Sequence, residues 1–246
     1  MFRLIYNIWL TIRLFKNWPQ ILLVRNLAQL RLRSGQQFAV NQTLGRAELS
    51  MLLDIWGRQV YDRVFAIGKH DVVVDVGANK GYFTVYASIQ ASKGRVFAFE
   101  PVPFLLEALA ENIKLNQLSN VEIISKALWE TAGRYRMYLT ENIGGHSLYQ
   151  KPWSKGELEI ETMTLEQFML DHGLEKINFL KLDCEGAEYN ILLNIKPEIL
   201  KRIEKIALEY HNFGVRSHHQ LVDCLRQAGF DVKVAGAYIY AQNKDF

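Results

Sequence analysis

Acids and glycines in the segment Val72–Phe83, VVVDVGANKGYF, have the spacing of a cofactor-binding turn. Three valines lead into Asp75, and Gly77 and Gly81 follow, which is typical of a buried parallel strand that turns sharply into a helix. Asp75 would repel a pyrophosphate but would accept hydrogen bonds from an ammonium group. It therefore indicates S-adenosylmethionine (SAM), whose amino-acid tail carries an amine and no phosphate.

A second acid, Glu100, favours the same cofactor. It follows the apolar strand Arg95–Phe99, where a carboxylate can bind both hydroxyls of a ribose. The dinucleotide fingerprint needs a glycine where Asn79 stands, so NAD is disfavoured. Because a glycine turn alone occurs in many doubly wound proteins, the SAM assignment depends on the two acids and the glycines together.

Polar residues also follow two later strands, and the carboxyl ends of parallel strands face the ligand crevice. Asp183, after LKL, is predicted to contact the cofactor or the substrate. Glu185 either binds substrate or caps the next helix. Glu209 and Asn212 are predicted to bind substrate.

His211 is the predicted general base, because imidazole titrates near neutral pH and this histidine lies at a strand end. Asp183 is the alternative base. Asp183 with His211 or Asn212 could also offer ligands to Mg²⁺, but no motif with metal-site spacing is present and we do not expect a metal.

Strands and helices that alternate along the chain must position these residues, which predicts an α/β fold. We expect a doubly wound, mostly parallel seven-stranded sheet that closes in an antiparallel hairpin across Ala235 and Gly236. The predicted strands are 72–75, 96–99, 121–124, 178–182, 205–209, 231–234 and 237–241. The predicted helices are 47–56, 82–91, 104–116, 165–172, 187–194 and 219–228.

The stretch 132–164 interrupts this alternation. Tyr135–Leu139 and Leu158–Thr162 have strand-like patterns, with turn residues between them. The insertion is either a lid or substrate wall, or a plain structural excursion.

Composition bounds the remaining possibilities. The chain has 246 residues, 49% of them hydrophobic, which supplies an ample core. Cys184 and Cys224 lie far apart without metal spacing, and no signal peptide is apparent, so we expect a reducing, cytoplasmic setting.

The positive charge is confined to residues 1–33, which carry six Lys and Arg and no acid, while the whole chain has a net charge of +3. The remaining residues therefore sum to −3. The uncharged runs Leu4–Ile12 and Asn17–Val24 are much shorter than the roughly 20 residues that span a bilayer. Apolar residues do not separate at helical period, and Pro19 interrupts the segment. We expect it to pack on the domain or on a partner, with peripheral membrane attachment as the alternative.

Together these motifs resemble the FkbM-type family of SAM-dependent methyltransferases. The resemblance rests on VVVDVGANKGYF, FAFEPVP, ENIKLNQLSNV, GGHSL, FLKLDCEGAEYNIL and IALEYH, and it runs from about Arg31 to Tyr210. It implies a class I methyltransferase domain at 46–246 behind an extension at 1–45. The implied activity is O-methylation of a hydroxyl on a glycan, polyketide or other small metabolite.

The resemblance also implies a set of cofactor contacts. The predicted set is Asp75, Gly77, Ala78, Asn79, Gly81, Tyr82, Glu100, Pro101, Ala127 and Asp183, with adenine near Ala127 and Leu128. Lys80, where an apolar residue is common in the family, predicts a more basic pocket rim.

Two rival functions are a non-catalytic binding protein held to a membrane or acidic polymer, and an RNA methyltransferase. The net acidic domain argues against nucleic acid. The acceptor and the oligomeric state stay open.

Overall fold

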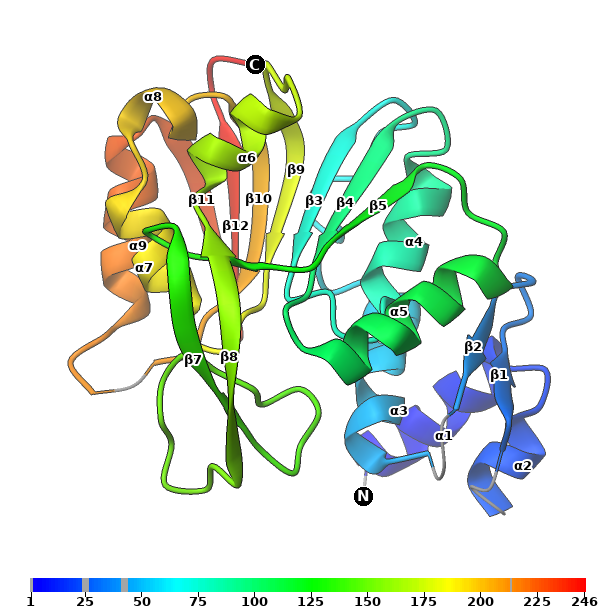
Figure 1. Cartoon of the computed structure of the whole chain (residues 1–246). Helices are drawn as coiled ribbons and strands as arrows, with labels where there is room; N and C mark the ends of the chain where they lie inside the picture. The colour runs from blue at the N-terminus through cyan, green and yellow to red at the C-terminus, as the bar shows by residue number, and fades with distance from the viewer. Residues whose placement is uncertain (1, 24–26, 41–43, 213) are drawn as a thin grey trace.

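The computed structural model describes residues 2–23, 27–40, 44–212 and 214–246. A seven-stranded sheet in the order β11-β12-β10-β9-β3-β4-β5 forms its centre (Figure 1). The strands are β3 (Val72–Val76), β4 (Arg95–Phe99), β5 (Val121–Ile124), β9 (Ile177–Leu182), β10 (Ile203–Glu209), β11 (Phe230–Ala235) and β12 (Tyr238–Asn243). Strands β5, β4, β3, β9 and β10 pair in parallel, and β12 pairs antiparallel with β10 and β11. The predicted doubly wound class I methyltransferase layout is therefore confirmed.

One detail of the predicted hairpin is wrong. Ala235 still pairs with Tyr238, so the turn consists of Gly236 and Ala237. Gly236 has a φ of 64°, a conformation that glycine adopts without steric cost.

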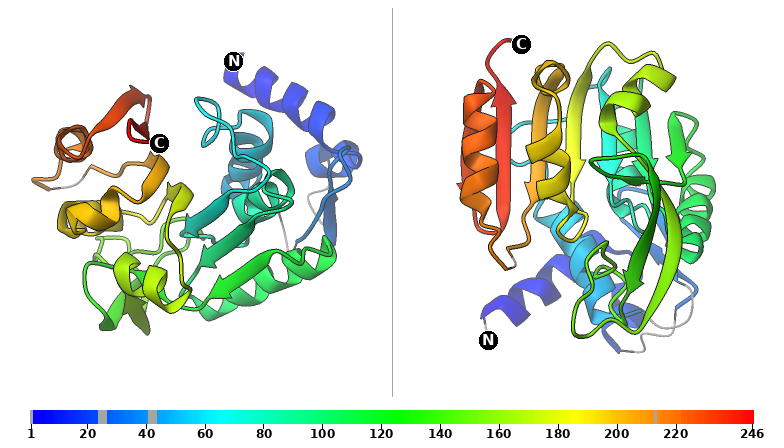
Figure 2. Two further views of the ribbon diagram at one scale, coloured as in Figure 1. Left: turned by 90° about the horizontal axis from the view of Figure 1, so that it is seen from above. Right: turned by 60° about the vertical axis from the view of Figure 1, so that its left-hand side comes forward.

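Helices cover both faces of the sheet (Figure 2). On one face lie α6 (Leu165–Asp171), α7 (Ala187–Asn194) and α9 (His218–Gln227), and on the other lie α4 (Tyr82–Gln90) and α5 (Pro103–Leu115). Side chains alternate between the faces along each strand, so both faces of a central strand must be apolar. Val74 packs in the same cluster as Phe168 of α6, whereas Val73 packs with Phe83 of α4.

The predicted interruption at 132–164 forms a small second sheet. It contains β6 (Ala127–Leu128), β7 (Gly133–Leu139) and β8 (Gly156–Met163). Strands β7 and β8 pair antiparallel and form a ribbon that extends past the main sheet (Figure 1). The connection between them, residues 140–155, lies at the carboxyl ends of the main strands.

The first 57 residues contain more regular structure than predicted. The elements are α1 (Phe2–Leu14), α2 (Trp18–Leu23), β1 (Gln29–Arg31), β2 (Gln37–Ala39) and α3 (Arg46–Leu52), which continues as a π-helical turn (Leu53–Gly57). A short helix α8 (Pro197–Leu200) was also not predicted. The predicted interruption at Pro19 is corrected, because Pro19 lies in the first turn of α2, where a missing N–H costs nothing.

The basic segment packs on the domain. Leu10, Phe15 and Phe38 share one buried cluster with Tyr82 and Val85 of α4. Because these side chains are sealed from water by the domain, the described part of the segment behaves as part of the same core. No helix among the described residues is long and apolar enough to cross a membrane. The boundary at residue 45 stays a prediction.

Candidate active site

The glycine turn after β3 is shaped by its neighbours on both sides. The N–H groups of Gly77 and Ala78 donate to the carbonyl oxygen of Phe99 at 3.1 and 2.9 Å. Gly77 has a φ of 77°, and a Cβ built on it would lie 2.0 Å from the carbonyl oxygen of Asp183. Only glycine fits there, so the turn approaches the end of β9 as closely as backbone can.

Asp75 lies beneath this turn and outside both pockets described below, and its contact with the SAM amine stays a prediction. Its side chain is fully buried, with Lys181 Nζ at 2.9 Å from Oδ1. The hydroxyl of Thr84 donates to Oδ2 at 2.6 Å. Lys181 also donates to the carbonyl oxygens of Val76 and Gly77 at 3.2 and 2.9 Å. Asp75 therefore holds Lys181 in the position from which the lysine donates hydrogen bonds to the turn.

A first pocket opens between the glycine turn, the end of β4 and the β7–β8 connection. It brings together several of the predicted cofactor contacts, namely Gly77, Asn79, Glu100, Pro101, Ala127 and Asp183. Leu128, predicted near the adenine, also lines it. Val76, Phe99, Val102 and Met137 make its floor apolar.

Glu100 is the acid of this pocket. Its two oxygens accept the N–H groups of Asn79 and Val102, each at 2.9 Å. Burial raises the pKa of Glu100 to about 7, although both hydrogen bonds oppose that shift. A carboxylate oxygen has two lone pairs, so each can still accept a hydroxyl from a ligand.

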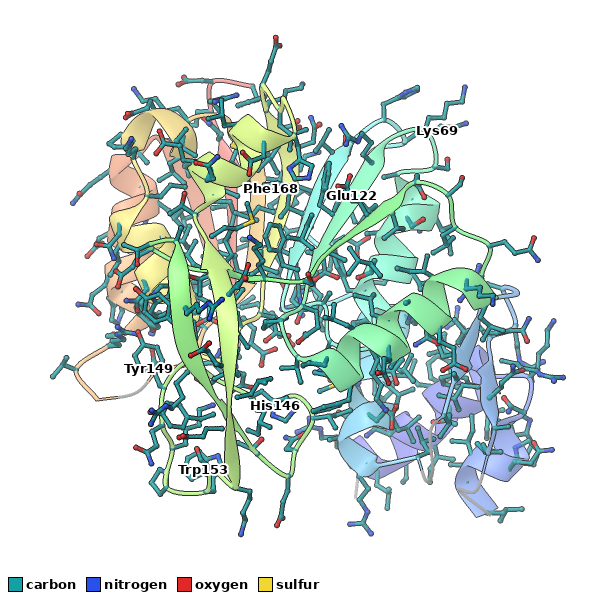
Figure 3. The ribbon with its side chains drawn as sticks, in the orientation of Figure 1. Lys69, Glu122, His146, Tyr149, Trp153 and Phe168 are labelled. Atoms are coloured by element: carbon teal, nitrogen blue, oxygen red, sulfur yellow. The ribbon has the colours of Figure 1, made fainter. Side chains whose placement is uncertain are left out.

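His146 also lines the first pocket, although sequence analysis gave it no role. Its Nδ1 accepts the N–H of Thr140 at 3.1 Å, and its Nε2 is buried with no hydrogen-bond partner among the described residues. Burial and the charge of Lys151 lower its pKa, so the ring is neutral. Figure 3 shows it on the segment between β7 and β8. The available signal was the GGHSL motif.

A second, larger pocket lies on the other side of the glycine turn. It shares Gly77, Asn79, Gly144, Asp183 and Glu185 with the first pocket. The predicted residues Ala78, Tyr82, Glu209 and His211 line this second pocket and not the first. The two pockets therefore meet at the end of β9.

Asp183 lies at this meeting point. The hydroxyl of Tyr61 donates to its Oδ2 at 2.7 Å, and Lys181 Nζ lies 4.0 Å from the same oxygen. Burial and the charge of Asp183 raise the pKa of Tyr61, so the phenol stays a donor. Sequence analysis identified neither Tyr61 nor Lys181, although Lys181 lies inside the FLKLDCEGAEYNIL motif.

Glu209, at the end of β10, is the second acid of the larger pocket. Burial and the nearby charge of Asp183 raise its pKa to about 7, while His211 lowers it. A carboxyl group with that pKa is ionised on the basic side of neutrality and remains a strong proton acceptor.

His211 is positioned as a cation, which argues against its predicted role as base. Its Nδ1 lies 3.1 Å from Oε1 of the fully buried Glu188, and its Nε2 lies 3.6 Å from Glu185. Burial lowers the pKa of His211, but Glu188, Asp183 and Glu185 outweigh it and raise the pKa to about 10. A ring protonated at neutral pH has no free lone pair for a substrate proton.

Glu185 does not cap the next helix. Glu188 takes that part, since it accepts the N–H groups of Cys184 and Gly186, each at 2.9 Å. Glu185 instead faces both pockets, with Lys151 Nζ of the β7–β8 connection at 2.5 Å. This leaves its predicted contact with substrate as the surviving alternative.

Three other predicted residues lie outside both pockets. Asn212 lines neither pocket, because its side chain accepts from Tyr189 and from the N–H of His218, each at 2.9 Å. Gly81 lies outside both pockets and begins α4 with a φ of 82°. Lys80 pairs with Glu48 at 2.7 Å and does not line a pocket, so it does not make the rim basic.

The described residues contain no group of three or more His, Cys, Asp or Glu side chains that could hold a metal ion.

Comparison with known proteins agrees with this geometry. The methyltransferase FkbM domain matches residues 75–232. Methyltransferase sdnD of Sordaria araneosa is 26% identical over 213 residues, covering 70% of this chain and 82% of that protein. The 31-O-demethyl-FK506 methyltransferase FkbM of Streptomyces tacrolimicus is 26% identical over 191 residues, covering 66% and 73%. The hexuronic acid methyltransferase AglP of Haloferax volcanii is 26% identical over 175 residues, covering 67% and 66%.

The fold and the two joined pockets define a SAM-dependent methyltransferase. The chain belongs to the FkbM methyltransferase family.

Proposed function

We propose that this enzyme methylates a hydroxyl group of a small metabolite or glycan. The relatives named 31-O-demethyl-FK506 methyltransferase and hexuronic acid methyltransferase support an oxygen acceptor. The carrying observation is the polar second pocket, in which Asp183 and Glu209 lie next to the cofactor pocket. Residues 34–246 are net acidic, so a nucleic acid is not the proposed acceptor.

The first pocket fits SAM. Glu100 has accepting lone pairs for the ribose hydroxyls, and His146 Nε2 is a buried polar atom that lacks a partner among the described residues. Asp183, at the junction of the pockets, is the proposed acceptor for the SAM amine in place of Asp75. When bound, SAM supplies an electrophilic methyl group.

We assign the general base to Glu209, which replaces His211. Glu209 would take the proton of the acceptor hydroxyl onto its carboxylate as that oxygen becomes a nucleophile. His211, held as a cation by Glu188, would stabilise the ionised acids around it. Glu185, fixed by Lys151, would orient the acceptor from the side of the β7–β8 connection.

The proposed reaction needs no metal. Mg²⁺ would need Asp183 as a ligand. Lys181 Nζ lies 4.0 Å from Oδ2 of Asp183 and already supplies positive charge to this acid. Activity should therefore survive EDTA.

The test is transfer of a radiolabelled methyl group from SAM to a panel of sugars, uronic acids and polyketide alcohols. We expect a base-stable ether product with a hydroxyl acceptor, and Glu209→Gln should abolish it. Glu159→Gln, an exposed change on β8, is the matched control. Tight SAM binding with transfer only to RNA would refute the acceptor class.

A further inference from the structure

Helix α1 is apolar on two opposite sides. Leu10 and Leu14 face Gly57 of the π-helical turn, where a Cβ on that glycine would lie 3.1–3.3 Å from their methyl groups. This side docks the helix on the domain.

The other side of α1 faces solvent. Ile5, Ile8, Trp9 and Ile12 have the i, i+3, i+4, i+7 spacing of one helix face, and all four are exposed. Leu4 adds to this stripe and is 65% exposed. Water-facing apolar side chains at this density mark a binding surface rather than scattered surface residues.

Helix α1 itself carries charge of one sign, although Asp54 of the π-helical turn lies with Arg3 and Tyr6 in a neighbouring groove. Arg3, Arg13 and Lys16 belong to or directly follow α1, and residues 1–33 contain no acid. The guanidinium of Arg13 lies 5.1 Å from the centre of the Trp9 ring, which joins the cationic and apolar parts of the face. An apolar stripe with an aromatic ring and flanking cations is the composition of helices that lie in a lipid interface.

We infer that α1 docks the enzyme on the surface of an anionic lipid bilayer. The stripe is one helix wide and α1 is positively charged, so two copies brought together here would bury little area and would repel each other. Anionic lipid headgroups satisfy both the cations and the apolar side chains. The helix is only 13 residues long and would lie along the surface rather than cross it.

The docking helix also borders the route into the larger pocket. A groove lined by Arg3 and Tyr6 of α1, by Arg63 and by Lys233 continues into that pocket, sharing Glu209 and Tyr238 with it.

Sedimentation with vesicles tests this inference without any assay of methyl transfer. The full chain should sediment with phosphatidylglycerol vesicles, sediment poorly with phosphatidylcholine vesicles, and be released at high salt, since charge attraction is screened over about 10 Å at 0.1 M. The double variant Ile5→Glu/Trp9→Glu should lower vesicle binding by about tenfold or more, because both side chains lose their apolar contact with lipid.

Leu170→Glu is the matched control, because Leu170 is 74% exposed on α6, away from α1 (Figure 1). It should bind vesicles like the wild type. Brominated lipids should quench tryptophan fluorescence in the wild type and much less in Trp9→Phe. Equal binding by all variants, or a dimer in light scattering that Ile5→Glu/Trp9→Glu dissociates without any vesicle binding, would overturn the inference. Calorimetry with SAM on the same variants keeps this outcome separate from the proposed function.

Discussion

Lys181 and Asp75 form a buried ion pair, with Nζ 2.9 Å from Oδ1, on adjacent strands of the main sheet. The lysine side chain is 4% exposed and that of the aspartate is fully buried. Because Lys181 also bonds the carbonyl oxygens of Val76 and Gly77, the pair connects the sheet to the turn that must receive the cofactor. The burial lowers the pKa of Lys181, but the charge of Asp75 outweighs it and keeps the lysine protonated.

Lys181→Met should destabilise the fold and weaken SAM binding together. It leaves Asp75 buried without its partner, which typically costs about 3–5 kcal/mol of unfolding free energy. Urea denaturation and calorimetry measure the two effects. The control is Lys196→Met, which breaks an exposed pair with Glu166 and should change stability by about 1 kcal/mol or less. If Lys181→Met were as stable as Lys196→Met, the Lys181–Asp75 pair would not stabilise the fold.

SAM affinity should depend on pH through Glu100. Its pKa in the ligand-free fold is raised to about 7, so the acid is neutral below that pH and ionised above it. Ribose hydroxyls bond the ionised form more strongly, so affinity should be constant above about pH 7.5 and should fall as the pH drops through 7. Calorimetry between pH 5.5 and 8.5 measures this.

Glu100→Ala should remove that pH dependence and weaken SAM binding by about 1.5–3 kcal/mol at pH 8, the range for hydrogen bonds to a charged group. A wild-type affinity that does not change with pH would exclude Glu100 as the ribose acid.

Much of this site could be predicted from the sequence, because most of its acids lie at the carboxyl ends of strands. Glu100, Asp183 and Glu209 each follow an apolar run, and a parallel sheet brings such positions to one edge. The sequence pattern could not show which of the acids already has an ion-pair partner in the fold. Asp75 and Asp183 both follow apolar strand residues in the sequence. Lys181 lies two residues before Asp183 but forms its ion pair with Asp75, because Lys181 and Asp75 are cross-strand partners in register.

Helix α1 was missed for a related reason. Periodicity analysis looks for one apolar face, and α1 has apolar residues on two sides, one against the domain and one in solvent. His211 was misjudged because its partner, Glu188, belongs to a helix that lies 23 residues earlier in the chain. Ordinary pKa values cannot anticipate a buried carboxylate brought near by the fold.

His211 should stabilise the fold in a pH-dependent way. Its pKa is raised from 6.5 to about 10, so its contribution is complete below pH 6.5 and disappears as the pH rises through about 10. His211→Gln should therefore lower the unfolding free energy by about 1.5–3 kcal/mol at pH 6, because Glu188 loses a charged donor. Urea denaturation at pH 6 and above pH 10 should show the difference between variant and wild type shrinking. NMR titration that places the imidazole pKa near 6.5 would restore His211 as a candidate base.

The proton acceptor is tested by the pH dependence of methyl transfer, measured with the acceptor found in the radiolabel screen. If Glu209 is the base, kcat/KM for the acceptor, measured at saturating SAM so that the pH dependence of SAM binding does not contribute, should rise with pH to a plateau with a midpoint near its pKa of about 7, because only the ionised carboxylate can take the proton. Glu209→Gln should lower kcat by about 10²- to 10⁴-fold and remove that acidic limb, while the Kd for SAM stays unchanged, since Glu209 does not line the first pocket. Glu209→Asp should keep the limb at a reduced rate, because the carboxylate survives but is withdrawn by one methylene. If Glu209→Gln keeps the limb and most of the rate, while Asp183→Asn loses both, the proton goes to Asp183, the other acid at the junction of the two pockets.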